Sequence, residues 1–146
     1  MSGETGTLVD GVSAAWNKHG PQKFAAQFSE DGVLRVIATG DVLCGREQLK
    51  AGAEAYLRAF PDLRMERRST YDCGETVCII ETTMKATHQG EFMGIPVTQR
   101  SVELLTCSIF MLGAGGLLGE ETVYFDAATL MGQLGVLPQP ADAQPF

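Results

Sequence analysis

Apolar residues recur at helical spacing in the first part of the chain and alternate with polar residues along much of the remainder. The first such stretch predicts a helix over 7–19, and glycine and proline at 20–21 separate it from a second short helix. A further amphipathic stripe predicts a helix over 46–60. The residues of that stripe are Leu49, Gly52, Ala53, Tyr56, Leu57 and Phe60.

Period-two alternation predicts a first strand over 33–38, following a turn at 29–32. Four longer strands are expected over 63–71, 76–89, 99–112 and 117–125. The glycine-rich run 113–116 leads from strand to strand, which indicates a hairpin turn and not a phosphate-binding loop. A last short helix is expected over 127–134, before a proline-rich tail at 138–146.

Consecutive strands joined by short turns, with helices only at their ends, are typical of an α+β domain and not of repeated βαβ units. With 146 residues, the chain is long enough for one hydrophobic core and too short for two. We therefore predict a single α+β domain over 1–146, folded from about 7 to 137, with a curved antiparallel or mixed sheet. Its helices should close one side of the sheet over an apolar pocket.

The net charge of −7 argues against binding to nucleic acid, because phosphate backbones would be repelled. The four cysteines include no Cys-x-x-Cys pair, so no metal site is expected, and reduced thiols fit a cytoplasmic protein. The longest uncharged stretch, 104–119, is too polar for a membrane span, and the N-terminus does not resemble a secretory signal. No membrane partner and no cofactor are expected.

His88 and Asp126 are the two candidates for chemistry. His88 shares the apolar face of its strand with Ile80 and Met84, where a hydrogen-bonded core histidine and a pocket histidine are both possible. Asp126 ends the last strand directly before a helix, so it can cap that helix. It can also be a carboxylate at the mouth of an apolar cavity, where desolvation would raise its pKa and make it a stronger base.

Several stretches resemble the SnoaL-like polyketide cyclases, over about residues 16–137. The stretches that carry the resemblance are Thr87-His88-Gln89-Gly90-Glu91-Phe92-Met93-Gly94-Ile95-Pro96-Val97-Thr98-Gln99-Arg100, Val123-Tyr124-Phe125-Asp126 and Leu130-Met131-Gly132-Gln133-Leu134-Gly135. Earlier matches are Trp16-Asn17, Phe28 to Asp31, Gly45 and Phe60-Pro61-Asp62-Leu63. Gln99 and Ala86 depart from the family pattern, which usually has glycine there.

The resemblance implies the cone-shaped fold of nuclear transport factor 2-like proteins and ring closure by an intramolecular aldol reaction without metal or cofactor. It implies that Asp126 is the acid/base and that His88 lines the pocket beside it. His88, with Tyr124 or Tyr56, would then hydrogen-bond the developing enolate oxygen. The expected walls of the pocket, which would bind a small apolar or polycyclic, polyketide-like ligand, are Trp16, Tyr56, Phe60, Met84, Phe110 and Tyr124.

Other activities fit the same fold. A related isomerase or dehydratase is one, and an epoxide hydrolase is another, although it would need a second carboxylate and an arginine such as Arg100 in the pocket. A non-catalytic binding or oligomerisation module is the alternative outside enzymology. A homo-oligomer, dimer or tetramer, is expected because the outer sheet face carries apolar residues such as Val77 and Ile79.

Overall fold

The two longest strands, β4 (Val77–Thr87) and β5 (Ser101–Leu112), bury alternate side chains along much of their length. In the computed structural model, which describes residues 3–137, they pair antiparallel from end to end. Since successive side chains point to opposite faces, one face of this central ladder lies on the core and the other faces outward.

The sheet has the strand order β2-β1-β6-β5-β4-β3. The remaining strands are β1 (Phe28–Val36), β2 (Asp41–Cys44), β3 (Arg64–Cys73) and β6 (Leu118–Phe125). Neighbours pair antiparallel except β1 and β6, which run parallel. The α+β class with a mixed sheet is therefore confirmed, and the parallel pair brings the first strand beside the last.

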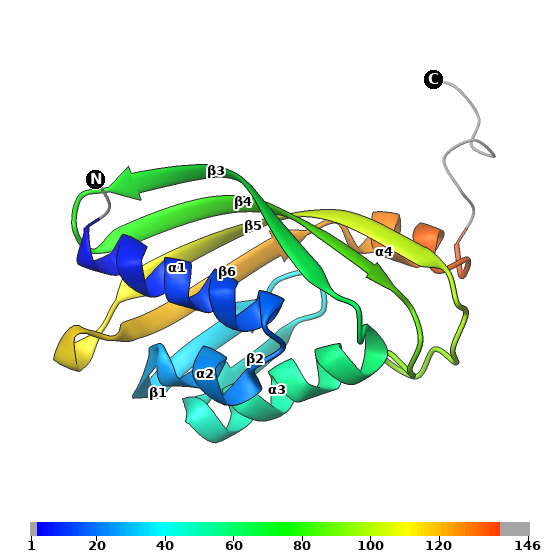
Figure 1. The fold of residues 1–146 in the computed structure, drawn as a ribbon, viewed down its shortest axis with the longest axis horizontal. Coiled ribbons are helices and arrows are strands. Elements are labelled where there is room, and N and C mark those ends of the chain that lie inside the picture. The colour runs from blue at the N-terminus through cyan, green and yellow to red at the C-terminus, as the bar shows by residue number, and fades with distance from the viewer. Residues whose placement is uncertain (1–2, 138–146) are drawn as a thin grey trace.

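Helices α1 (Glu4–Asn17), α2 (Pro21–Ala26) and α3 (Gly45–Ala59) lie on one side of the curved sheet, as Figure 1 shows. The break after α1 is where the sequence predicts it, with Gly20 preceding Pro21 at the first position of α2. The short helix α4 (Ala127–Gln133) follows β6 directly. The proline-rich tail predicted at 138–146 lies outside the described residues.

The turn expected at 29–32 is wrong, because these residues belong to β1. The strand is irregular there: its register with β6 shifts between Phe28 and Val33. Gly32 is needed at this irregularity, since a Cβ on it would lie 2.8 Å from the Cβ of Phe28. The polar residues that suggested a turn thus occupy a bulge within a strand.

Strand β2 was not expected at all. It spans only Asp41–Cys44, and none of its four positions is fully buried. A strand this short and exposed has too few residues for its alternation to be recognised. Its pairing with β1 makes it the outermost strand beside α3.

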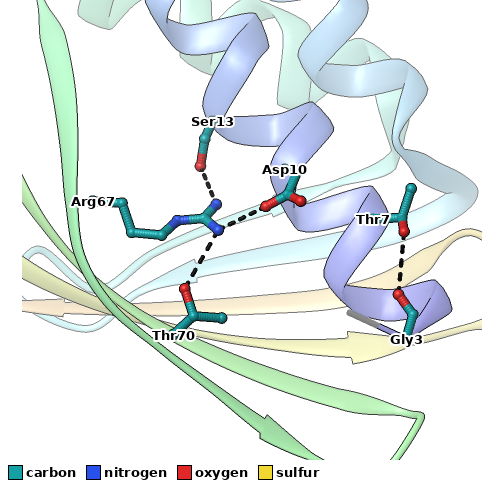
Figure 2. A network of polar contacts seen from close by, with 6 residues as sticks. All are labelled: Gly3, Thr7, Asp10, Ser13, Arg67 and Thr70. Atoms are coloured by element: carbon teal, nitrogen blue, oxygen red, sulfur yellow. Dashed lines mark hydrogen bonds and ion pairs between the residues drawn. The ribbon is translucent and has the colours of Figure 1, made fainter. Parts of the chain in front are cut away.

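An arginine on the edge strand β3 fastens α1 over the sheet (Figure 2). The guanidinium of Arg67 donates from Nη1 to Asp10 Oδ1 and from Nη2 to Ser13 Oγ, both at 2.7 Å. Nη1 also approaches Thr70 Oγ1 at 3.4 Å. These contacts hold α1 against β3, so the inner sheet face stays covered at this edge.

Candidate active site

A cavity of about 100 Å³ lies between the inner face of the sheet and helices α1 and α3. We call it the inner cavity. Its apolar walls are Val12, Trp16, Leu34, Val36, Tyr56, Leu63, Met65, Ile80, Met84, Leu104, Phe110, Val123 and Phe125. Its polar walls are Ser13, Thr82, Thr106, Ser108 and Glu121. A mostly apolar cavity with a few polar groups is typical of a small-molecule site.

Four of the polar residues form a stripe across β4, β5 and β6. Thr82 is opposite Thr106 in the β4–β5 register, and Phe110 is opposite Glu121 in the β5–β6 register. Ser108 lies two residues from both Thr106 and Phe110, so it shares their face of β5. The polar stripe therefore consists of Thr82, Thr106, Ser108 and Glu121, in an otherwise apolar wall.

Glu121 is the charged residue of this cavity, and its side chain is 6% exposed. Burial raises its pKa to about 7, although a hydrogen bond with Ser108 acts in the opposite direction. Its Oε1 atom has no hydrogen-bond partner among the described residues. A carboxyl group in this state can exchange a proton near neutral pH and has one oxygen free to meet a ligand.

Thr82 supplies a second polar group. The neighbouring Thr106 hydroxyl donates to the backbone carbonyl of Thr82 at 3.1 Å, so the Thr106 hydroxyl is already engaged. The Thr82 Oγ1 atom is buried and has no partner in the described part of the chain. Buried polar atoms are seldom left unpaired in proteins, so Thr82 and Glu121 both have hydrogen-bonding capacity for a bound molecule.

Asp126 lies in a different environment, at the start of α4. Its Oδ1 accepts a hydrogen bond from the backbone N–H of Ala128 at 3.1 Å, and its Oδ2 accepts one from the Thr129 hydroxyl at 2.5 Å. The side chain is exposed and does not line the inner cavity. The hydrogen bond from Thr129, with those from backbone amides, lowers the pKa of Asp126. Of the two alternatives for Asp126, the structure shows the helix cap, and the raised pKa expected for a carboxylate at the cavity mouth is not found.

His88 is fully buried beside the end of β4, outside the lining of the inner cavity. Its Nδ1 accepts the backbone N–H of Thr98 at 3.2 Å and lies 2.8 Å from the Thr98 hydroxyl. Its Nε2 atom is buried and has no hydrogen-bond partner among the described residues. The ring packs against Phe60, with centroids 5.7 Å apart. These contacts join the end of β4 to the segment that leads into β5.

The sequence model of the SnoaL-like polyketide cyclase family matches residues 7–134 of this chain. The chain belongs to this family. No curated protein matches it significantly.

Several solved structures are similar to this chain in fold. AclR from Streptomyces galilaeus, a proposed hydroxylase, is 28% identical, with 93% of this chain and 87% of AclR covered and a TM-score of 0.79. A SnoaL-like protein from Jannaschia, a proposed polyketide cyclase, is 15% identical, with coverage of 92% and 94% and a TM-score of 0.82. A protein from Catenulispora acidiphila with a ketosteroid isomerase-like fold is 20% identical, with coverage of 97% and 99% and a TM-score of 0.77. The cone-shaped fold of nuclear transport factor 2-like and ketosteroid isomerase-like proteins is thus the fold of this SnoaL-like chain.

Four of the expected wall residues face the inner cavity of this SnoaL-like domain, namely Trp16, Tyr56, Met84 and Phe110. Phe60 does not line it, because its ring is buried between His88 and Phe92. Tyr124 does not line it either. It pairs with Cys107 and is 44% exposed on the outer face of the sheet.

Glu121 was missed by the sequence analysis, although a signal was present. Glu121, Val123 and Phe125 alternate along β6, and the latter two are apolar. Because side chains two residues apart point to the same face of a strand, Glu121 is expected on the inner face with Val123 and Phe125. A charged residue in phase with a buried apolar face is the kind of exception that marks a candidate site.

Two further features limit the chemistry. Arg100 donates from Nε to the backbone carbonyl of Gln133 at 2.7 Å, near the end of α4, and it does not line the inner cavity. The arginine that an epoxide hydrolase would need is therefore not supplied by Arg100. Within residues 3–137, no cluster of three or more potential metal ligands is found. Nor does that part of the chain contain a helix long and apolar enough to cross a membrane.

Proposed function

We propose that this SnoaL-like protein closes a ring by a cofactor-independent intramolecular aldol reaction in the inner cavity, with Glu121 as the acid/base. The observation that carries this proposal is a buried carboxyl group with a pKa of about 7 and an unpartnered oxygen, set in an apolar cavity. Its ligand would be a small apolar or polycyclic, polyketide-like molecule. Family membership supports the reaction class, and the geometry of Glu121 supports the residue.

The reaction has three steps. Ionised Glu121 removes a proton from a carbon between two carbonyl groups and becomes a neutral acid. The enolate carbon forms a bond to a carbonyl carbon of the same molecule, whose π electrons move to its oxygen. The resulting alkoxide takes the proton from Glu121, which regenerates the carboxylate. The product is an isomer of the substrate, so no oxidant, reductant or metal is consumed.

The rest of the polar stripe would assist. The Thr82 hydroxyl lies on the same wall and is free to donate to the enolate or alkoxide oxygen. The Ser108 hydroxyl stabilises the ionised form of Glu121 and so limits how far burial raises its pKa. A carboxyl group balanced near neutral pH can both accept and return the proton.

Asp126 and His88 remain competing candidates from the family resemblance. Asp126 would have to leave Ala128 and Thr129 to reach a substrate in the inner cavity, since both of its oxygens are engaged in the helix cap. His88 has an unpartnered Nε2 among the described residues, but it lies outside the lining of the inner cavity. We therefore assign the proton transfer to Glu121 and a structural role to Asp126.

The test compares three single variants, Glu121→Gln, Asp126→Asn and Glu120→Gln. Glu120 is the matched control, because it adjoins Glu121 but forms an ion pair with Arg35 at partly exposed positions. The substrate is a synthetic fused aromatic ketone with a β-ketoester arm long enough for ring closure, and the isomeric product is separated by chromatography. Removal of a general base should cost about 10²- to 10⁴-fold in kcat.

We expect that loss for Glu121→Gln and near-native rates for the other two variants. Loss in Asp126→Asn with full activity in Glu121→Gln would transfer the role to Asp126. Tight binding of the aromatic ketone by the wild-type protein without turnover would instead favour a non-catalytic binding module.

We also propose that the protein is a symmetric homo-oligomer, a dimer or tetramer, joined through the outer sheet face. That face exposes Leu105, Met111 and Tyr124, which are about half exposed. Exposed apolar clusters of this kind often mark protein interfaces. Sedimentation at high micromolar concentration should give the mass of an oligomer, and Leu105→Glu should reduce it to that of a monomer. A wild-type monomer would rule the proposal out.

A further inference from the structure

A second cavity, of about 210 Å³, adjoins the inner cavity and is about twice as large. We call it the outer cavity. It lies between α3, the strands β1 and β2, and the segment 91–93. Its walls are Trp16, Phe24, Leu34, Val36, Asp41, Leu43, Leu49, Gly52, Ala53, Ala55, Tyr56, Glu91, Phe92 and Met93.

Four residues line both cavities, namely Trp16, Leu34, Val36 and Tyr56. A single layer of side chains therefore separates the two spaces. The rings of Trp16 and Tyr56 meet edge to face, with centroids 6.4 Å apart. Both side chains are only partly buried, so this layer is not sealed within the core.

The volumes indicate what each space can hold. A dry apolar cavity of about 150 Å³ accommodates one benzene molecule. The inner cavity, at about 100 Å³, therefore suits no more than the reacting end of a multi-ring molecule. A larger substrate whose reacting carbon reaches Glu121 can extend past Trp16 and Tyr56 into the outer cavity, which shares these two residues.

We propose that the inner and outer cavities form one substrate channel, with the Trp16–Tyr56 pair as its constriction, and that its substrate is elongated, apolar and free of negative charge at its outer end. This proposal rests on the proposed function, because the reacting end is placed beside Glu121. The remaining rings occupy the outer cavity against α3.

Small residues on α3 create the room for those rings. Gly52, Ala53 and Ala55 all line the outer cavity. Gly52 also permits the contact with β2, since a Cβ on it would lie 2.5 Å from Leu43 Cδ1. Larger side chains at these positions would occupy the channel directly, which makes Ala53 a residue that determines substrate length.

The charge of the outer cavity restricts the substrate further. Its ionisable wall residues, apart from Tyr56, are the exposed carboxylates Asp41 and Glu91, and no basic residue lines it. Burial raises the pKa of Tyr56 to about 12, and the nearby negative charge of Asp41 adds to that rise. A second negative charge would be repelled here, whereas a neutral group would not.

The experiment uses 2-hydroxyanthraquinone as a three-ring probe and p-cresol as a one-ring probe. Binding is measured by calorimetry, with quenching of Trp16 as a local reporter, because this chain has a single tryptophan. Ala53→Leu should fill part of the outer cavity. Ala51→Leu is the matched control, since Ala51 is exposed on the same helix and lines neither cavity.

We expect Ala53→Leu to weaken binding of the three-ring probe by about tenfold or more, as a well-packed site excludes extra methyl groups. Binding of p-cresol should weaken less than that of the three-ring probe, because a single ring needs only part of the outer cavity, and Ala51→Leu should affect neither probe. Equal effects on both probes, or no effect on the three-ring probe, would overturn the channel. Leu43→Phe fills the same cavity from β2 and serves if Ala53→Leu does not fold.

The charge requirement is tested with anthraquinone-2-carboxylate against anthraquinone-2-carboxamide. The carboxylate should bind about fivefold more weakly at low salt, and the double variant Asp41→Asn/Glu91→Gln should remove most of that difference. Equal binding of the two probes to the wild-type protein would overturn this part of the proposal.

Glu121→Gln separates the two proposals. It should retain the preference for the three-ring probe while losing turnover. If turnover proceeds but binding shows no dependence on probe length, the channel is wrong and the proposed function stands. If length dependence holds while Glu121→Gln keeps full activity, the channel stands and the role of Glu121 is wrong.

Discussion

Glu121 and Asp126 lie five residues apart on and just beyond the same strand, yet their carboxyl groups have opposite properties. Burial raises the pKa of Glu121 to about 7, whereas hydrogen bonds from Thr129 and the start of α4 lower the pKa of Asp126. Glu121 has an unpartnered oxygen in the inner cavity, and both oxygens of Asp126 are engaged in the cap.

This difference shows why a residue's position at the end of a strand is a weak guide to chemistry. Asp126 is where a family resemblance directs attention, but its surroundings favour a stable anion that holds a helix in place. Glu121 sits where ionisation is costly, so its proton is exchanged easily near neutral pH. A carboxyl group that transfers protons near neutral pH needs surroundings like those of Glu121.

The largest expected effect concerns stability. The folded pKa of Glu121 is above its unfolded value, so folding binds an extra proton at intermediate pH and stability is lost as pH rises from about 4.5 to about 7. Glu121→Gln removes this titration. Between pH 5 and pH 8 the wild type should therefore lose on the order of 2 kcal/mol of unfolding free energy that the variant does not lose. Urea denaturation at both pH values measures it. Parallel pH dependence in the two proteins would show that Glu121 is not buried in this way.

The next effect tests the helix cap. Asp126→Ala removes the acceptor for Ala128 and Thr129 and should lower Tm by about 2–4 °C. Asp126→Asn should retain a Tm close to that of wild type, because asparagine caps as well as aspartate. Thermal unfolding followed by circular dichroism at pH 7 distinguishes them. A lower kcat for Asp126→Asn at unchanged Tm would break the contrast with Glu121.

The cap should also respond to pH with the opposite sign. Because the folded pKa of Asp126 is lowered, its contribution is present at neutral pH and is lost as pH falls below the usual range of an aspartate. The Tm difference between wild type and Asp126→Ala should therefore shrink in acid. A difference that grows in acid would contradict the hydrogen-bonded anion.

The smallest effect refines the environment of Glu121. Ser108 lowers the pKa of this carboxyl group through its hydrogen bond, so Ser108→Ala should raise it further. The rising limb of kcat/KM with pH, expected near pH 7 in the wild type, should move upward by less than about one unit. Thr106→Ser, which keeps a hydroxyl in the same stripe, is the matched control and should leave the limb in place. An unmoved limb in Ser108→Ala would remove Ser108 from the site.

The sequence by itself determined the α+β class, the helix break at Gly20-Pro21 and most strand positions, because these follow from local periodicity and backbone preference. It also indicated the cap at Asp126 correctly, since capping depends only on the residues that follow. Four of the wall residues followed from alternation along the strands and the helical stripe.

Only the tertiary structure decided the surroundings of the candidate groups. Helices α1, α2 and α3 lie over the inner face of the sheet (Figure 1), and Arg67 holds α1 to β3. That cover takes Glu121 out of water, and this burial raises the pKa of its carboxyl group. Tyr124 is out of phase with Glu121 along β6 and lies on the outer face, whereas Phe60 was assigned to the wall although its ring packs against His88 and Phe92. Periodicity gives the face of an element, whereas the packing of distant elements decides what that face meets.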